Sequence, residues 1–232
     1  MKKLCITGSS GFIGGELVKH FAGKFSIVKY DLKNGQDILD YKRLKQSIRG
    51  CDIVIHCAAL RKPYQDKTFA DYFQINCLGT FNIAQAAVET GVKRLIFTSS
   101  TSYYGAEKGI PHLRPIRESN PVLTQHVQLK DLHCRDCDIA YSTSKVIAEQ
   151  ILANYGLTKK IEIIILRLGP TRKQGEYRPF LGLHLTIENA LQALELAATS
   201  KKKLWYEALT ITDNVKDVNL SKAKRLLGYN PR

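Results

Sequence analysis

The sequence predicts an α/β protein in which helices cover both faces of a parallel sheet. Short apolar runs alternate with stretches whose apolar residues recur at helical spacing along most of the chain. The first apolar run, residues 3–7, leads through a glycine-rich segment into the first of those stretches, which begins at Phe12. Strands that alternate with helices in this way are expected to be parallel, because each crossover helix returns the chain to the same end of the sheet.

In the first half of the chain, each expected strand is followed by a turn or a helix. The strands are expected at residues 3–7, 26–30, 52–56 and 94–98. The helices are expected at residues 12–21, 41–48 and 69–89, the last of them ending near Gly91.

From Gly105 to Ile139 the pattern breaks into proline, histidine, arginine and polar residues, which indicates a long loop next to a site. The alternation then returns. Helices are expected at residues 141–155, 186–198 and 221–227, and strands at residues 161–168, 204–206 and 209–212. The whole pattern predicts a doubly wound parallel sheet of the Rossmann type.

Composition limits the size of the protein and its partners. A chain of 232 residues with 44% apolar composition can bury one sizeable core and a small appended lobe. The net charge of +14 could attract nucleic acid, an anionic membrane or a phosphorylated substrate, or could simply keep the surface soluble. Because the cations are scattered and form no arginine-rich or aromatic-interleaved tract, we expect no nucleic-acid partner.

The compartment is predicted from the apolar runs and the cysteines. No apolar run approaches the length of a membrane span, and the N-terminus does not resemble a signal peptide, so we expect no membrane partner. Four of the six cysteines fall in expected strands or helices as buried free thiols, namely Cys5, Cys51, Cys57 and Cys77. These features favour a reducing cytoplasm.

The glycine-rich segment predicts a dinucleotide site. A pyrophosphate must approach backbone N–H groups at a helix N-terminus, and Gly8, Gly11 and Gly14 remove the side chains that would obstruct it. A merely tight turn is the alternative, but the segment follows a strand and opens a helix, as the binding mechanism requires.

Two acidic residues extend this site. Asp31 ends the second expected strand, where a carboxylate accepts hydrogen bonds from the adenosine ribose and repels a 2′-phosphate, so NAD is expected in preference to NADP. Lys29 and Lys33 lie close enough to reach a phosphate. Asp37, followed by Ile38, is expected near the adenine amino group, or else acts as an ordinary acid at a helix N-terminus.

Tyr141 and Lys145 form a candidate proton-transfer pair. A tyrosine has an ordinary pKa near 10, and a lysine one helical turn along lies on the same face, where its charge favours the phenolate. Hydroxyl side chains at residues 98–102 follow a parallel strand and therefore point to the sheet edge where ligands bind, or else only cap the backbone.

Taken together, these motifs resemble the extended short-chain dehydrogenase/reductase superfamily and, within it, the NAD-dependent epimerase/dehydratase family. The chain is similar to UDP-sugar 4-epimerases with a shortened substrate lobe. The resemblance rests on T-G-x-x-G-x-x-G, H-x-A-A, N-x-x-G-T, a serine-rich turn ending in Tyr-Gly, and Y-x-x-x-K, at residues 7–14, 56–59, 76–80, 97–105 and 141–145.

The resemblance implies roles for particular residues. Tyr141 is the expected base, Ser100 orients the substrate oxygen, and Lys145 fixes the tyrosine and the nicotinamide ribose. Residues expected to bind NAD are Gly8, Gly11, Phe12, Ile13, Gly14, Asp31, Asp37, Ile38, Ala58, Ala59, Asn76, Tyr141, Lys145 and Leu168. Residues expected to contact substrate are Ser100, Thr101, Ser102, Arg172 and Arg178. A homodimer through the helices at residues 69–89 and 141–155 is also implied.

The chain departs from the family pattern after Arg167. Leu168, Gly169, Pro170 and Thr171 stand where many nucleotide-sugar members carry an asparagine, and only 87 residues follow Lys145. We therefore expect residues 1–168 to form the NAD-binding domain with the catalytic residues, and residues 169–232 to form a reduced substrate-binding α/β lobe and closing helix packed on it. The short uronate dehydrogenases resemble the chain in size.

The long loop also carries a C-x-x-C pair, Cys134 and Cys137, next to His133. This is half of a zinc site, but no second half stands at a typical spacing, so no metal is expected. The predicted function is hydride transfer at a sugar or nucleotide-sugar hydroxyl, with epimerisation as the first hypothesis. A short NAD-dependent sugar or uronate dehydrogenase is the alternative, and an NAD-binding regulatory protein without turnover is an alternative of another class.

Overall fold

Six parallel strands form the central sheet of the computed structural model, which describes residues 1–61, 66–105, 114–122, 136–173, 175–176 and 183–232. The spatial order is β2-β1-β3-β4-β5-β8. The strands are β1 Lys3–Thr7, β2 Ser26–Tyr30, β3 Ile53–His56, β4 Arg94–Ser100, β5 Glu162–Leu168 and β8 Tyr206–Ile211. A short parallel pair, β6 Thr171–Arg172 and β7 Leu185–Thr186, lies outside this sheet.

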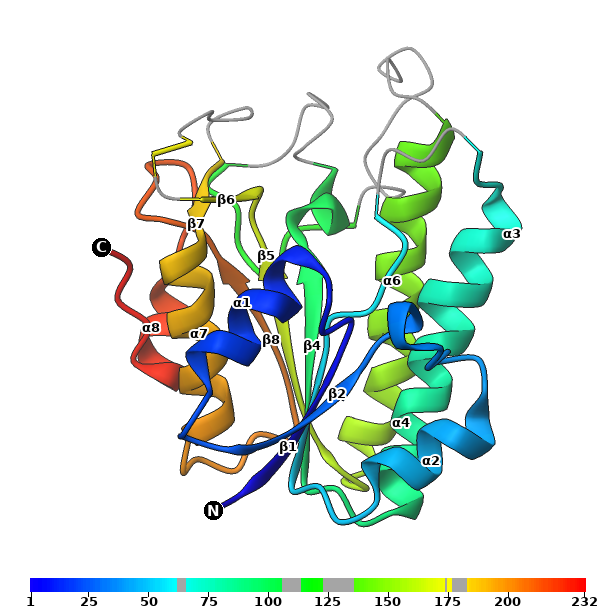
Figure 1. The fold of residues 1–232 in the computed structure, drawn as a ribbon. Coiled ribbons are helices and arrows are strands. Elements are labelled where there is room, and N and C mark those ends of the chain that lie inside the picture. The colour runs from blue at the N-terminus through cyan, green and yellow to red at the C-terminus, as the bar shows by residue number, and fades with distance from the viewer. Residues whose placement is uncertain (62–65, 106–113, 123–135, 174, 177–182) are drawn as a thin grey trace.

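Helices cover both faces of the sheet, as Figure 1 shows. On one face lie α1 Phe12–His20, α7 Ile187–Thr199 and α8 Ser221–Leu227. On the other lie α2 Tyr41–Ile48, α4 Gly79–Glu89 and α6 Asp136–Leu157. Alternate side chains of each strand supply the two cores: Leu4 and Ile6 of β1 pack with α1, whereas Cys5 packs on the other face. The doubly wound parallel sheet is therefore confirmed.

The helix expected at residues 69–89 is one helical run with a change of geometry in its centre. It begins as α3 Phe69–Tyr72, continues as the π-helical stretch η2 Phe73–Leu78, and ends as α4. Thr68 caps its start, because its hydroxyl accepts from Asp71 N while the Asp71 carboxylate accepts from Thr68 N. Short 3-10 turns, η1 Leu32–Asn34 and η3 Thr101–Tyr104, follow β2 and β4.

The structure corrects several element boundaries. β4 runs to Ser100, whereas the expected strand ended at residue 98. The strands expected at residues 204–206 and 209–212 are a single strand, β8, in which Glu207 interrupts the apolar pattern. A polar residue is tolerated there because β8 is an edge strand and Glu207 forms an ion pair with Lys222. In addition, α6 begins at Asp136 rather than at Tyr141, because acidic residues are favourable in the first turn of a helix although they add nothing to its apolar stripe.

Residues after Leu168 complete the main sheet. β8 pairs with β5, and α7 and α8 pack on the same face as α1. Part of the expected long loop is hydrogen-bonded to the segment between β8 and α8: Ile116 N donates to Asp217 O, and Asn219 N donates to Ile116 O. None of the helices in the described part of the chain has the length and apolar character needed to cross a membrane.

Candidate active site

The glycine-rich loop connects β1 to α1 and leaves no room for side chains. Gly8 has φ +70°, and a Cβ placed on it would lie 2.7 Å from Ala58 N. A Cβ on Gly14 would lie 2.8 Å from the carbonyl carbon of Gly8. Among the described residues no side chain caps α1, whose N-cap is Gly11. The first N–H groups of α1 therefore remain available to an anion, as a pyrophosphate site requires.

Asp31 lies beside this loop. One carboxylate oxygen, Oδ2, accepts from Ser10 N at 2.8 Å, and the other, Oδ1, accepts from Lys33 N at 2.9 Å. Two backbone hydrogen bonds hold the carboxylate at the carboxyl end of β2, next to the helix N-terminus. This is the relative placement expected for a group that binds the ribose of a dinucleotide.

Asp37 and Ile38 contact residues of the segment around them and of α4. Asp37 Oδ1 accepts from Leu39 N at 2.9 Å, which forms a local turn, and the N-cap of α2 is Asp40. Ile38 is buried, and its Cγ1 lies 3.0 Å from where a Cβ on Gly79 would stand. Contact of these two residues with adenine stays a prediction.

Asn76 holds the loop that follows β3. Its Oδ1 accepts from Leu60 N at 2.7 Å, and its Nδ2 donates to Leu60 O at 2.9 Å and to Ser144 Oγ at 2.8 Å. The side chain is supplied by the π-helical stretch, a geometry that often occurs at functional sites. Asn76 thus connects the loop carrying Ala58 and Ala59 to α6, and at 2% exposure it offers little surface of its own.

Lys145 lies in the core beneath the end of β4. Its Nζ donates to Thr98 O at 2.9 Å and lies 4.6 Å from the centroid of the Phe97 ring and 5.7 Å from that of the Tyr141 ring. Burial lowers the pKa of the lysine to about 8, although the nearby acidic groups Cys57, Glu149 and Cys77 oppose this shift. The predicted Tyr141 and Lys145 pair is therefore brought together.

Ser100 ends β4 and caps the 3-10 turn η3. Its Oγ accepts from Ser102 N at 3.1 Å and donates to Ser102 Oγ at 3.1 Å. Thr101 and Ser102 are fully buried in that turn and do not line the cavity described next. Of the three hydroxyl residues expected to contact substrate, Ser100, Thr101 and Ser102, Ser100 is the one that the structure brings to the cavity.

A cavity of about 270 Å³ collects many of the predicted residues at the carboxyl edge of the sheet. Its predicted lining residues are Phe12, Ile13, Ala59, Ser100, Tyr141, Lys145, Leu168 and Arg172. Thr98 and Ser99, which belong to the hydroxyl cluster expected at residues 98–102, also line it. Five further lining residues were not predicted as site residues: Cys57, Arg61, Gly169, Pro170 and Thr171. All of these follow or end β3, β4 or β5, so the rule that ligands bind where parallel strands end would have found them.

Some predicted positions lie elsewhere. Arg178, His133 and Cys134 fall outside the described residues, and Cys137 lies in the first turn of α6. No group of three or more metal-ligating side chains occurs in the part of the chain that the structure describes.

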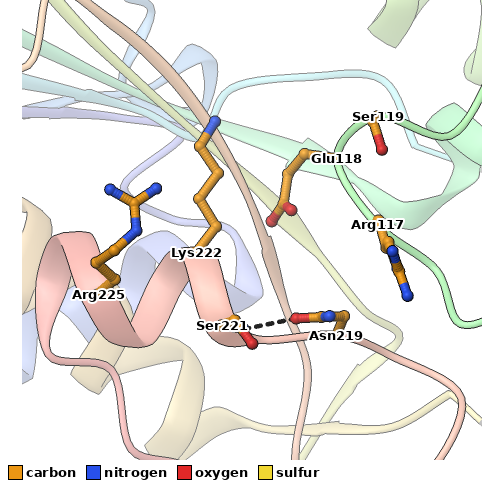
Figure 2. Close-up of a pocket in the computed structure, with 7 residues that line it drawn as sticks. All are labelled: Arg117, Glu118, Ser119, Asn219, Ser221, Lys222 and Arg225. Carbon is orange, nitrogen blue, oxygen red and sulfur yellow. Dashed lines mark hydrogen bonds between the residues drawn. The ribbon is translucent and has the colours of Figure 1, made fainter.

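A second, more open groove of about 560 Å³ lies along the outer edge of β8 (Figure 2). There Glu118 Oε1 accepts from Thr210 N at 2.8 Å, and Lys222 Nζ donates to Ala208 O at 3.0 Å. These side chains saturate outward-facing backbone groups of the edge strand, which protects the edge from pairing with another chain. Its lining residues are Arg117, Glu118, Ser119, Asn219, Ser221, Lys222 and Arg225, and it contains none of the predicted site residues.

A glycine cradle at a helix N-terminus, a carboxylate at the end of β2 and a tyrosine and lysine on one cavity define the class of protein, a dinucleotide-dependent oxidoreductase. Residues 4–216 match the model of the NAD dependent epimerase/dehydratase family, and the chain belongs to that family. The predictions of the family and of NAD as cofactor are confirmed.

Individual relatives are distant. The chain is 27% identical to cinnamoyl-CoA reductase 1 of Petunia hybrida, over 94% of this chain and 67% of the relative. It is 24% identical to L-arabinose 1-dehydrogenase (NAD(P)(+)) of Haloferax volcanii, over 100% of this chain and 97% of the relative. The fold is similar to that of a UDP-glucuronic acid 4-epimerase from Bacillus cereus in complex with NAD, with a TM-score of 0.75 and 19% identity over 99% of this chain and 93% of that one.

Proposed function

We propose that this protein oxidises a hydroxyl group of a small sugar or sugar acid, with transfer of a hydride to NAD. The observation that carries the proposal is the cavity in which Ser100, Tyr141 and Lys145 meet beside the glycine loop residues Phe12 and Ile13. When bound, NAD supplies the hydride acceptor. The reaction also needs a base for the hydroxyl proton, and Tyr141 is the only phenol among the described residues that line the cavity.

Each of the three side chains has a task in this proposal. The Ser100 hydroxyl donates to the substrate oxygen and orients it. The Tyr141 phenolate takes the hydroxyl proton, and the Lys145 ammonium favours that phenolate by its charge. Lys145 can do this because its Nζ is anchored at Thr98 O, on the side of α6 that faces the cavity.

Net oxidation is the first reaction to test, because a relative that the chain matches over nearly the whole length of both sequences is L-arabinose 1-dehydrogenase. The alignment with that dehydrogenase covers 100% of this chain and 97% of the relative, whereas the alignment with UDP-glucose 4-epimerase of Vibrio cholerae, at 28% identity, covers 72% of this chain and 51% of the relative. The Arg61 and Arg172 side chains at this cavity favour a substrate with a carboxylate or phosphate group.

The test is absorbance of NADH after the protein is mixed with NAD and a panel of aldoses, uronates, sugar phosphates and UDP-sugars. We expect steady accumulation of NADH with wild type and a loss of at least about 10³-fold in Tyr141→Phe. Conversion of a sugar to its epimer without NADH accumulation would show that the protein is an epimerase and would refute net oxidation. Binding of NAD without turnover of any compound, by wild type and Tyr141→Phe alike, would favour a regulatory protein instead.

We also propose a homodimer that buries the helical run from α3 to α4. Four large apolar side chains of this run are exposed to solvent by 36% to 49%: Phe69, Phe73, Leu78 and Phe81. Exposed apolar patches of this kind mark protein interfaces. Light scattering should give twice the chain mass for wild type and the single mass for Phe81→Glu, and a monomeric wild type would refute the dimer.

The same proposal assigns NAD binding and the catalytic residues to residues 1–168, and substrate binding, through Arg172, to residues 169–232. A reducing compartment such as the cytoplasm is also proposed, because Cys5, Cys51, Cys57 and Cys77 are free thiols.

A further inference from the structure

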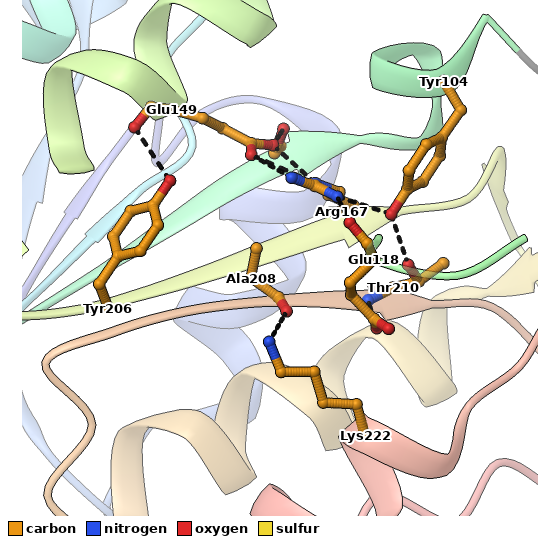
Figure 3. A network of polar contacts seen from close by, with 9 residues as sticks. Tyr104, Glu118, Glu149, Arg167, Tyr206, Ala208, Thr210 and Lys222 are labelled. Carbon is orange, nitrogen blue, oxygen red and sulfur yellow. Dashed lines mark hydrogen bonds and ion pairs between the residues drawn. The ribbon is translucent and has the colours of Figure 1, made fainter. Parts of the chain in front are cut away.

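A buried ion pair lies behind the turn that carries Ser100. Glu149 in α6 and Arg167 in β5 are 0% and 4% exposed. Arg167 Nη2 donates to Glu149 Oε2 at 2.7 Å, and Arg167 Nε donates to both carboxylate oxygens at 3.1 and 3.2 Å (Figure 3). A buried ion pair lowers stability unless its remaining polar atoms also form hydrogen bonds. The residues that form those hydrogen bonds are the ones that the pair holds in place.

The shorter of the remaining contacts go to the two ends of the serine turn, and a longer one runs from Arg167 Nη1 to Glu118 O at 3.3 Å. Ser99 Oγ donates to Glu149 Oε1 at 2.6 Å, and Arg167 Nη1 donates to Tyr104 Oη at 2.7 Å. Ser99 directly precedes Ser100, and Tyr104 is the last residue of η3. The Arg167 guanidinium also lies 3.5 Å from the centroid of the Tyr103 ring. The turn that Ser100 caps is therefore held at both ends by one ion pair.

The same pair is joined to the other elements of the site. Glu149 lies one helical turn beyond Lys145 in α6, and Lys145 lies one turn beyond Tyr141. Arg167 precedes Leu168, which lines the cavity. Tyr104 Oη and Thr210 Oγ1 of β8 are 3.0 Å apart, so the network extends to the edge strand. One pair thus fixes the end of β4, helix α6 and the end of β5 relative to one another.

We propose that Glu149 and Arg167 are positioning residues that hold the Ser100 hydroxyl in place relative to the Tyr141 and Lys145 side chains. Neither residue lines the cavity, so neither is expected to touch the substrate. This inference rests on the proposed function for the roles of Ser100 and Tyr141. A displacement of about 1 Å at a reacting centre can lower a rate by about 10²-fold, so the loss of such a clamp should be visible in kcat.

The chain provides a matched control at the opposite end of the same two strands. β4 and β5 are in register with Ser99 opposite Arg167 near their carboxyl ends and Arg94 opposite Glu162 at their amino ends. Arg94 Nε donates to Glu162 Oε2 at 2.8 Å, and the two side chains are 10% and 15% exposed. Glu162→Gln therefore weakens a largely buried ion pair between the same strands, at the end of the sheet opposite the cavity.

The test compares Tyr104→Phe and Arg167→Lys with Glu162→Gln. Tyr104→Phe removes only the hydroxyl that Arg167 contacts, so it carries the test if Arg167→Lys does not fold. Amide hydrogen exchange of residues 99–105 is measured first, because it needs no substrate. We expect exchange there to rise about tenfold in Tyr104→Phe and in Arg167→Lys, with no change at residues 53–56, and no rise at residues 99–105 in Glu162→Gln.

Kinetics with NAD and a turned-over sugar give the second readout. We expect kcat to fall about 10- to 100-fold in both network variants while KM for NAD stays within about twofold, and kcat of Glu162→Gln to stay within about twofold of wild type. Wild-type exchange at residues 99–105 in the network variants would overturn the inference, as would a looser turn with unchanged kcat. If wild type turns over no sugar, the proposed function fails, and the exchange result still decides whether the pair holds the turn.

Discussion

Lys145→Met should make the cofactor-free protein more stable while abolishing turnover. Lys145 is 2% exposed, and its ammonium has one backbone acceptor, Thr98 O, together with the face of the Phe97 ring. The methionine side chain is of similar length and volume and carries no charge. A group kept for function in a place where it lowers stability is the trade-off expected of an active site.

The magnitude follows from the depressed pKa of the lysine. A change from the usual value of 10.5 to about 8 corresponds to a cost of about 3 kcal/mol for holding the charged form in the folded protein at neutral pH. Methionine gives up the hydrogen bond to Thr98 O, worth about 1 kcal/mol, so the net gain in the free energy of unfolding is about 2 kcal/mol. For a chain of this size that gain raises Tm by about 4–8 °C.

The advantage of the methionine variant should depend on pH in a defined direction. Below pH 8 the lysine is protonated in both the folded and the unfolded chain, so the cost is present in full. Between pH 8 and 10.5 the unfolded chain binds more protons than the folded one, so the free energy of unfolding of wild type rises with pH. The difference in Tm between the variant and wild type should therefore be largest at pH 7 and shrink as pH approaches 10.

Thermal unfolding of the cofactor-free proteins, followed by circular dichroism at pH 7, 8.5 and 9.5, measures this difference. Lys93→Met is the control, because the Lys93 side chain is 79% exposed and its replacement should change stability by less than about 0.5 kcal/mol at each pH. The reasoning is refuted if Lys145→Met is no more stable than wild type at pH 7, or if its advantage does not change between pH 7 and 9.5.

Three further predictions concern the glycine loop, the ribose site and the amino end of the sheet. Gly14→Ala should lose NAD binding and lower Tm, because its Cβ would stand 2.8 Å from the carbonyl carbon of Gly8. Titration calorimetry measures the affinity of the variant for NAD, and a wild-type affinity would contradict this prediction. Asp31→Asn should weaken NAD binding about tenfold and reduce the preference for NAD over NADP. Titration of the variant with each cofactor measures both effects, and an unchanged ratio of the two affinities would contradict the prediction. Arg94→Met should lower the free energy of unfolding by about 3–5 kcal/mol in urea, because it leaves the Glu162 carboxylate without its partner, while the affinity for NAD stays at the wild-type value.

Local patterns predicted most of the fold correctly. The alternation of apolar runs and helical stretches placed β1 and α2 at the residues where they lie, because a strand buried on both faces and a helix with one buried face have distinct patterns. The errors occurred where burial does not shape the pattern. β8 is an edge strand that tolerates Glu207, and the first turn of α6 carries acids instead of an apolar stripe.

For the site, motifs predicted the residues that touch the cavity better than those that support them. Tyr141, Lys145 and Ser100 were expected from spacing and resemblance, and the structure brings all three to one cavity. Arg61 was not predicted as a site residue, although it stands five residues beyond His56, the last residue of β3. Glu149 was not predicted, because nothing in its local sequence shows that its partner lies 18 residues away in another element.

The sequence by itself predicted the class of fold, the cofactor and the pairing of Tyr141 with Lys145, because each depends on residues close together in the chain: a strand that ends in glycines, a carboxylate at a strand end, and a tyrosine one helical turn from a lysine. Only the tertiary structure decided what surrounds them. The lowered pKa of Lys145 comes from burial beneath β4, and the clamp on the Ser100 turn comes from the pairing of α6 with β5. Burial and pairing between distant elements are properties of packing, which no single stretch of sequence contains.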